Sequence, residues 1–282
     1  IEVRSAKSDI DIMGRIHADA VDSRVILDAF EQVKIGGDLE KAIIRVSELL
    51  HVVGGFAGED DDGLSFSLST GSGLIAVGRT SEGKPGQIKV DAKGDLEIMG
   101  HLVSGETWDG HEVHWSDKKG DIIIKSGGVA YIGAKPSTES DRWEKTGARV
   151  SAADLVQITG ESINKVAVVI HPESELVTGH SNSRIVIESK SGVQVLGTVM
   201  PGGKIIHQND TNNEFVGRKL ENLGGDSSLE VKAAGEIVLG QSVSAGKLVK
   251  LTGEGDESGG GIKLQGTTRL ETWAQDSRIE LD

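Results

Sequence analysis

The segment Gly78–Lys84 contains most of the residues of a phosphate-binding loop. Such a loop holds phosphate with the N–H groups of a glycine-rich turn, a lysine and a Mg²⁺-binding Ser or Thr, and it leads into a helix. Here Pro85 stands where the hydroxyl residue is required, and the strand-like run Gln87–Val90 follows in place of the helix. We therefore predict that this segment does not bind a nucleotide.

Two acidic segments carry the oxygen ligands that calcium prefers. They are Glu59–Gly63 and the shorter Glu254–Glu257. Neither has the spacing of an EF-hand loop or of the glycine-rich nonapeptide of calcium-binding β-rolls. Solvated acidic loops are the favoured interpretation, so we predict no metal site and no cofactor, with Ca²⁺ at these loops as the alternative.

The sequence has no motif typical of a hydrolase or a thiolate centre. It contains no cysteine and no Gly-x-Ser-x-Gly nucleophile motif. His111 and His114 are three residues apart, which places them on opposite faces of a strand and differs from the helical His-Glu-x-x-His spacing. Two carboxylates on neighbouring repeats could still meet, but the sequence does not name the pair. We therefore predict no catalytic residue.

Three tryptophans raise the question of sugar binding. Trp108 and Trp143 fall in glycine-rich or polar segments, beside Asp109 and Arg142 respectively. An exposed indole there could stack on a sugar ring while its neighbours bond hydroxyl groups, although a ring folded back as a lid over the domain edge is the favoured interpretation. Trp115 keeps the strand parity of Val113 and is expected in the core.

Composition limits the fold that could position these residues. The 282 residues include 30 Lys+Arg and 44 Asp+Glu, which give a net charge of −14 and argue against a nucleic-acid partner. Glycine is abundant, with 39 residues, whereas Phe, Trp and Tyr number only four, four and one. No window approaches eighteen apolar residues, so we predict no membrane span. A core must therefore be built from Val, Ile, Leu and Ala.

One short pattern recurs along the chain. Ile1–Ile16 and Ile88–Leu102 share the order apolar-x-apolar, polar turn, apolar-x-apolar, glycine. The pattern returns at intervals of roughly 20 to 24 residues, which are typical of solenoid repeats. Its other copies are Val25–Gly37, Val113–Gly127, Val150–Gly160, Ile185–Gly197 and Leu229–Gly240.

The repeat predicts an all-β fold. Its period of two places Ile, Val and Leu on one face of each strand, and stacking successive coils in parallel buries that face. We predict a right-handed parallel β-helix of about a dozen coils, on the order of 60 Å long. Glycines that end the copies should lie at corners that need a positive φ or a close backbone approach. These glycines are Gly14, Gly100, Gly160, Gly197 and Gly240.

Residues 1–282 are predicted to form one β-solenoid domain, and the strand-like ends suggest a segment of a longer repeat protein. A helical pattern over Asp38–Val53 is the one local alternative. Five insertions interrupt the repeat and are expected on one face. They are Gly54–Gly63, Ser104–Gly110, Ala134–Gly147, His207–Ser228 and Gly253–Gly261.

The phrase Ile88–Leu102 and its copies resemble the repeats of filamentous-haemagglutinin-like bacterial surface proteins. The resemblance implies a secreted β-helix rod that presents adhesive regions, although the Asn-Pro-Asn motifs of that family's secretion region do not occur in this sequence. We expect a non-enzymatic rod segment at the bacterial cell surface or outside the cell. Its expected partners are cell-surface or matrix components, including polysaccharide, or further copies of itself in a filament. The alternatives are a β-helix polysaccharide lyase or hydrolase and a trimeric phage tail-fibre segment.

Overall fold

In the computed structural model the chain forms three parallel β-sheets. The structure describes residues 1–282 except 38–39, 57–62, 106, 109–112, 115–117, 137–146, 165, 210–214, 223–224 and 256–260, and it gives no side-chain detail for 107–108, 113–114, 204–209 and 215–222. No helix occurs among the described residues. The prediction of an all-β parallel solenoid is confirmed.

Each turn of the chain, which we call a coil, contributes one strand to each sheet in the order A, B, C. Sheet A contains β1 (Glu2–Ser5), β4 (Arg24–Ala29), β7 (Leu49–Gly54), β10 (Gly86–Ala92), β15 (Gly120–Ser126), β18 (Leu155–Gly160), β21 (Arg184–Ser189), β26 (Ser228–Ala233), β29 (Leu248–Gly253) and β32 (Arg278–Leu281). Sheet B contains β2 (Ile10–Ile12), β5 (Val33–Ile35), β8 (Leu64–Leu68), β11 (Asp95–Ile98), β16 (Ala130–Ile132), β19 (Val166–Ile170), β22 (Gly192–Val195), β27 (Ile237–Leu239) and β30 (Ile262–Leu264). Sheet C contains β3 (Arg15–Ala18), β6 (Ile43–Val46), β9 (Gly73–Ala76), β12 (His101–Ser104), β17 (Arg149–Ala152), β20 (Glu175–Thr178), β23 (Thr198–Pro201), β28 (Val243–Ala245) and β31 (Leu270–Thr272).

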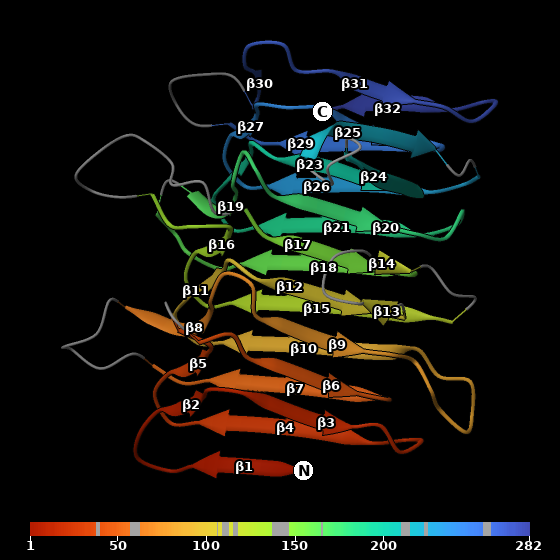
Figure 1. The fold of residues 1–282 in the computed structure, drawn as a ribbon. Coiled ribbons are helices and arrows are strands. Elements are labelled where there is room, and N and C mark those ends of the chain that lie inside the picture. Colours follow the sequence, from red (N-terminus) through yellow and green to blue (C-terminus); the bar gives the residue numbers. More distant parts are fainter. Residues whose placement is uncertain are drawn as a thin grey trace.

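The coils stack in chain order from the red amino-terminal end to the blue carboxy-terminal end (Figure 1). Ser228 lies opposite Leu248, a step that agrees with the predicted repeat, whereas Arg184 lies opposite Ser228 because an insertion lengthens the coil between them. The described sheets have ten, nine and nine strands, compared with the expectation of about a dozen coils. The right-handed winding stays a prediction.

Aliphatic side chains form one continuous core inside the three sheets. In sheet A, Leu50, Ile88 and Ile122 are registered neighbours and are fully buried. Phe66 is the one aromatic member of this cluster among the described residues. The narrow interior therefore explains why the chain has so few aromatic residues.

The helical alternative for Asp38–Val53 is wrong. The described part of this segment forms β6 and β7, and the side chains of Ile44, Val46, Leu50 and Val52 are fully buried. These residues alternate with less buried ones, so the period-two pattern decides the structure where both templates fit.

Two antiparallel hairpins depart from the repeat. β13 (Thr107–Trp108) pairs with β14 (Val113–His114), and β24 (Gly203–Asn209) pairs with β25 (Phe215–Asn222). The predicted coil phrase Val113–Gly127 is therefore wrong in its first part, because Val113 pairs with Trp108 outside the parallel sheets. Its second part is right, because it supplies β15.

The five insertions do not share one face, contrary to the prediction. We name the corners by the sheets that they connect. Gly54–Gly63 and Gly253–Gly261 connect strands at the A–B corner, Ala134–Gly147 at the B–C corner, and Ser104–Gly110 and His207–Ser228 at the C–A corner. Every corner of the solenoid therefore accepts extra residues, because a loop there leaves the strand ladders intact.

The outward face of sheet C carries a second apolar row. Ile75, Val103, Val177 and Met200 lie in one register row with Ser151, and all of them are nearly inaccessible to solvent. β13 contacts β12 and β24 contacts β20, so both hairpins meet this sheet. One strand of each hairpin therefore lies close to a strand of sheet C.

Corners are built from glycines and buried serines. Gly14 has a φ of 120°, the positive φ that was predicted for a corner glycine. A Cβ at Gly100 would lie 2.4 Å from the carbonyl oxygen of Ser72, so Gly100 allows the close backbone approach that was also predicted. Sequence analysis did not anticipate the serines. Ser174 Oγ accepts the N–H of Ala148 at 3.0 Å and donates to the carbonyl of Ile132 at 2.7 Å. It thereby satisfies backbone groups where the ladder is interrupted.

We expect Ile88→Ala to destabilise the domain by about 2–5 kcal/mol, because it leaves a cavity between Leu50 and Ile122. Lys89→Ala on the outer face of the same strand is the control and should change stability by less than about 0.5 kcal/mol. Urea unfolding monitored by circular dichroism measures both. Equal, small effects of the two substitutions would contradict the assignment of Ile88 to the core.

Candidate functional site

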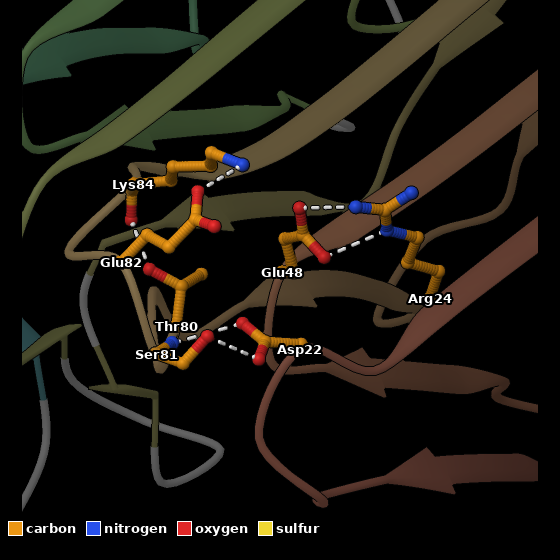
Figure 2. A network of polar contacts seen from close by, with 7 residues as sticks. All are labelled: Asp22, Arg24, Glu48, Thr80, Ser81, Glu82 and Lys84. Carbon is orange, nitrogen blue, oxygen red and sulfur yellow. Dashed lines mark hydrogen bonds and ion pairs between the residues drawn. The ribbon is translucent and has the colours of Figure 1, made fainter.

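The loop-like segment Gly78–Lys84 is a C–A corner tied to an earlier coil. It lies between β9 and β10, and Asp22 lies between β3 and β4. Ser81 donates its N–H to Asp22 Oδ1 at 2.9 Å and its hydroxyl to Oδ2 at 2.6 Å (Figure 2). These bonds lower the pKa of Asp22. The carboxylate takes the donors that a phosphate would need, and β10 follows instead of a helix, so the segment lacks the geometry of a nucleotide site.

An ion pair between Arg24 and Glu48 joins neighbouring coils beside this contact (Figure 2). Arg24 holds Glu48 with two hydrogen bonds, from Nε at 2.7 Å and from an Nη at 2.6 Å. This hydrogen bonding lowers the pKa of Glu48, whose side chain is only 11% exposed, and keeps it ionised. Arg24 pairs with Glu48 and Lys84 with Glu82, while Asp22 accepts the hydrogen bonds of Ser81. These internal contacts favour a role in fixing the corner over a role in catalysis.

Two carboxyl groups, Asp121 and Asp154, lie on neighbouring coils farther along the rod. Asp154 Oδ2 accepts the N–H of Gly120 at 2.9 Å, and its Oδ1 lies 2.9 Å from Nδ1 of His180. The adjacent Asp121 is partly buried, and this burial, together with the charge of Asp154, raises its pKa. A carboxyl group with a raised pKa beside a carboxylate is a pattern also found in acid–base sites. Sequence analysis left such a pair open and could not name it, because the register was unknown; it favoured no functional pair.

A buried polar row crosses the outer face of sheet C. His101, Arg149 and Glu175 are registered neighbours on β12, β17 and β20. Arg149 Nε lies 3.3 Å from Glu175 Oε2, and both side chains are largely buried. Burial, and then the charge of Arg149, lowers the pKa of His101 to about 4. His101 is therefore neutral in the folded chain at physiological pH.

Most of the residues singled out from the sequence lie outside the described part of the structure. This applies to Trp115, Trp143, His111, the acidic run Glu59–Asp62 and the residues Asp256 and Glu257. Trp108 and His114 lie in the hairpin strands β13 and β14, without described side chains. Among the described residues, no group of three His, Asp or Glu is arranged to hold a metal ion.

The A–B corner carries a groove that sequence analysis missed. The groove has a volume of about 410 Å³ and is lined by Phe30, Phe56, Arg4, Asp28 and Lys93 among others. Phe30 is 62% exposed and Phe56 is 68% exposed. Each phenylalanine follows a strand of sheet A, β4 or β7, so the signal in the sequence was an aromatic residue just beyond a strand end. The sequence alone does not show that β4 and β7 are neighbours; this follows only from the strand register in the structure.

Comparison with known proteins finds no relative: no family model, no curated protein and no solved structure matches the chain. Across the described residues, no helix is suited by length and hydropathy to crossing a membrane. The function must therefore be argued from the fold and from the surfaces that its register creates.

The low pKa of His101 predicts a specific loss of stability in acid. Between about pH 6.5, the unfolded value, and about pH 4, the unfolded chain binds a proton that folded His101 does not, so stability falls as the pH falls through this interval. His101→Gln should remove up to roughly 3 kcal/mol of this pH dependence. Urea unfolding at pH 7 and at pH 4.5 measures it.

The control for this prediction is His17→Gln, which changes an exposed histidine on β3 of the same sheet. It should follow the wild-type dependence on pH. The same acid loss in His101→Gln and wild type would show that His101 is protonated in the folded chain.

Proposed function

We propose that the chain is a non-enzymatic structural rod segment of a large secreted or cell-surface protein. The observation that supports this proposal is the single aliphatic core running through the stacked coils from Ile10 to Leu251. Stacked parallel coils give a stiff body that lengthens by one strand spacing, about 4.8 Å, with each added coil. Such a body suits a spacer that holds binding regions at a distance.

Charge patterning on sheet A suits an exposed rod. Glu230, Lys250 and Glu280 are registered neighbours, and Lys250 Nζ lies 3.7 Å from Glu280 Oε2. On an earlier coil, Arg4 lies opposite Asp28 in the same way. Alternating signs relieve the repulsion that like charges would suffer across strands in a chain of net charge −14. A polar outer face stabilised in this manner needs no covering domain.

The repeat phrase extends the proposal to a particular kind of rod. Its similarity to filamentous-haemagglutinin-like repeats favours an adhesin-like, filament, sheath or matrix component at the bacterial surface or outside the cell. The partners would be cell-surface or matrix components, including polysaccharide, or further copies of the chain in a filament. The loops at all three corners are the surfaces on which such partners would bind.

Cryo-electron microscopy of the full-length protein, on or shed from its producing cells, tests this proposal. We expect a rod with an axial repeat near 4.8 Å that antibodies against residues 1–282 label on intact cells. Labelling that appears only after the cells are permeabilised would contradict the surface location. A short, discrete particle would contradict the rod.

A second candidate function is hydrolysis or lysis of an acidic polysaccharide. The raised pKa of Asp121 beside the Asp154–His180 pair is the observation that favours it. If this candidate is right, the chain degrades at least one of pectate, alginate and hyaluronan, with or without Ca²⁺, and Asp121→Asn abolishes the activity. Asp91→Asn on the same sheet should leave it intact. No degradation of any of the three would remove this candidate.

A further inference from the structure

Phe30 and Phe56 form an exposed aromatic pair on a rigid corner. Phe30 donates its N–H to the carbonyl of Ser5 at 2.9 Å, and Lys93 donates its N–H to the carbonyl of Gly54 at 3.0 Å, so ladder bonds hold the backbone on both sides of the pair. A Cβ at Gly55 would lie 1.7 Å from the carbonyl oxygen of Phe30. Glycine at this position lets the two coils approach and brings their aromatic residues to the same groove.

The polar groups around the rings can both donate and accept hydrogen bonds. Arg4 and Lys93 are donors and Asp28 is an acceptor, and all three line the groove with the two rings. Lys93 Nζ lies 5.7 Å from the centre of the Phe56 ring, and Arg4 Nε lies 3.9 Å from Asp28 Oδ2. The groove therefore combines aromatic faces with hydrogen-bonding groups of both kinds, a combination typical of small-molecule recognition sites.

We propose that this groove binds a neutral polysaccharide chain. A sugar ring presents C–H bonds on its faces and hydroxyl groups around its edge. The faces can pack on the electron-rich faces of Phe30 and Phe56. The hydroxyl groups can accept from Arg4 and Lys93 and donate to Asp28. Neighbouring coils are about 4.8 Å apart, a spacing close to the length of one sugar unit in an extended glycan.

Charge and shape favour this ligand over other occupants. Within the groove Asp28 offsets part of the positive charge of Arg4 and Lys93, and the net charge of −14 on the chain repels an acidic polymer. The polar groups of both signs that line the groove with the rings suit hydroxyl groups better than the apolar side chains of a protein partner. This inference deepens the proposed function, because it names a ligand class for one corner of the rod.

Affinity gel electrophoresis of the purified chain tests the proposal with five soluble probes: mixed-linkage β-glucan, xyloglucan, glucomannan, galactomannan and dextran. We expect at least one of these gels to retard the wild-type chain. Phe30→Ala and Phe56→Ala should each weaken that binding at least tenfold, measured by calorimetry with an oligosaccharide of the same polymer. Phe30→Tyr keeps the aromatic face and should retain binding.

Ile163→Ala is the matched control, because Ile163 is 89% exposed and lies between β18 and β19 at the same corner but outside this groove. It should bind as the wild type does. Thermal unfolding of all four variants should match that of the wild type, since the substituted side chains are exposed. Any loss of binding then reports on the groove and not on folding.

Three results would overturn the proposal: no retardation in any of the five gels, equal retardation of wild type and both alanine variants, or self-association in sedimentation that the alanine variants abolish. The last result would assign the groove to a second copy of the chain. None of these results bears on the rod, which electron microscopy tests separately. Conversely, glycan binding by a short particle would support this groove and contradict the rod.

Discussion

The parallel register between neighbouring coils is the constraint on which the rest of the structure depends. Each strand places its backbone N–H and C=O groups against the coils before and after it, so where the register is regular an inward residue stacks on another inward residue. Leu50, Ile88 and Ile122 show the result in sheet A. The interior is therefore narrow and uniform, which suits branched aliphatic side chains and leaves little room for aromatic ones.

The same register organises the outer surface. Outward residues also stack, so Glu230, Lys250 and Glu280 alternate in sign where like charges would repel. Interruptions of the ladder gather at corners, where serines such as Ser174 satisfy backbone groups and glycines such as Gly55 allow close approach. The side chains at the corners can therefore differ from coil to coil without disturbing the core. The Phe30–Phe56 groove and the Asp22–Ser81 contact are two such corners.

The sequence predicted the strands well where the residue pattern is compatible with only one structure. The phrase Ile88–Leu102 alternates within each of its apolar-x-apolar runs and forms most of β10, all of β11 and the start of β12. The copy Val113–Gly127 begins with the same phrase, yet its first residues, Val113–His114, pair antiparallel with β13, because an alternating sequence does not specify the direction of the partner strand.

Sites that depend on residues from two or more coils could not be predicted in the same way. Asp121 and Asp154, or Phe30 and Phe56, become neighbours only through the register of strands that are distant in the sequence. A shift of one residue in register would place different side chains together. The loop Gly78–Lys84 shows the same limit. Its Ser81 binds Asp22, which lies on an earlier coil and is not part of the sequence motif.

Disulfide trapping in this cysteine-free chain tests the register most directly. Lys89 lies opposite Ile123, and Ile123 lies opposite Gln157. The double variant Lys89→Cys/Ile123→Cys places two cysteines one coil apart, with Cα atoms separated by about 4.8 Å, a distance that a disulfide spans. We predict rapid cross-linking of this variant under mild oxidation and none in Lys89→Cys/Gln157→Cys, whose thiols are two coils apart. Cross-linking of the second pair in preference to the first would contradict the parallel stack.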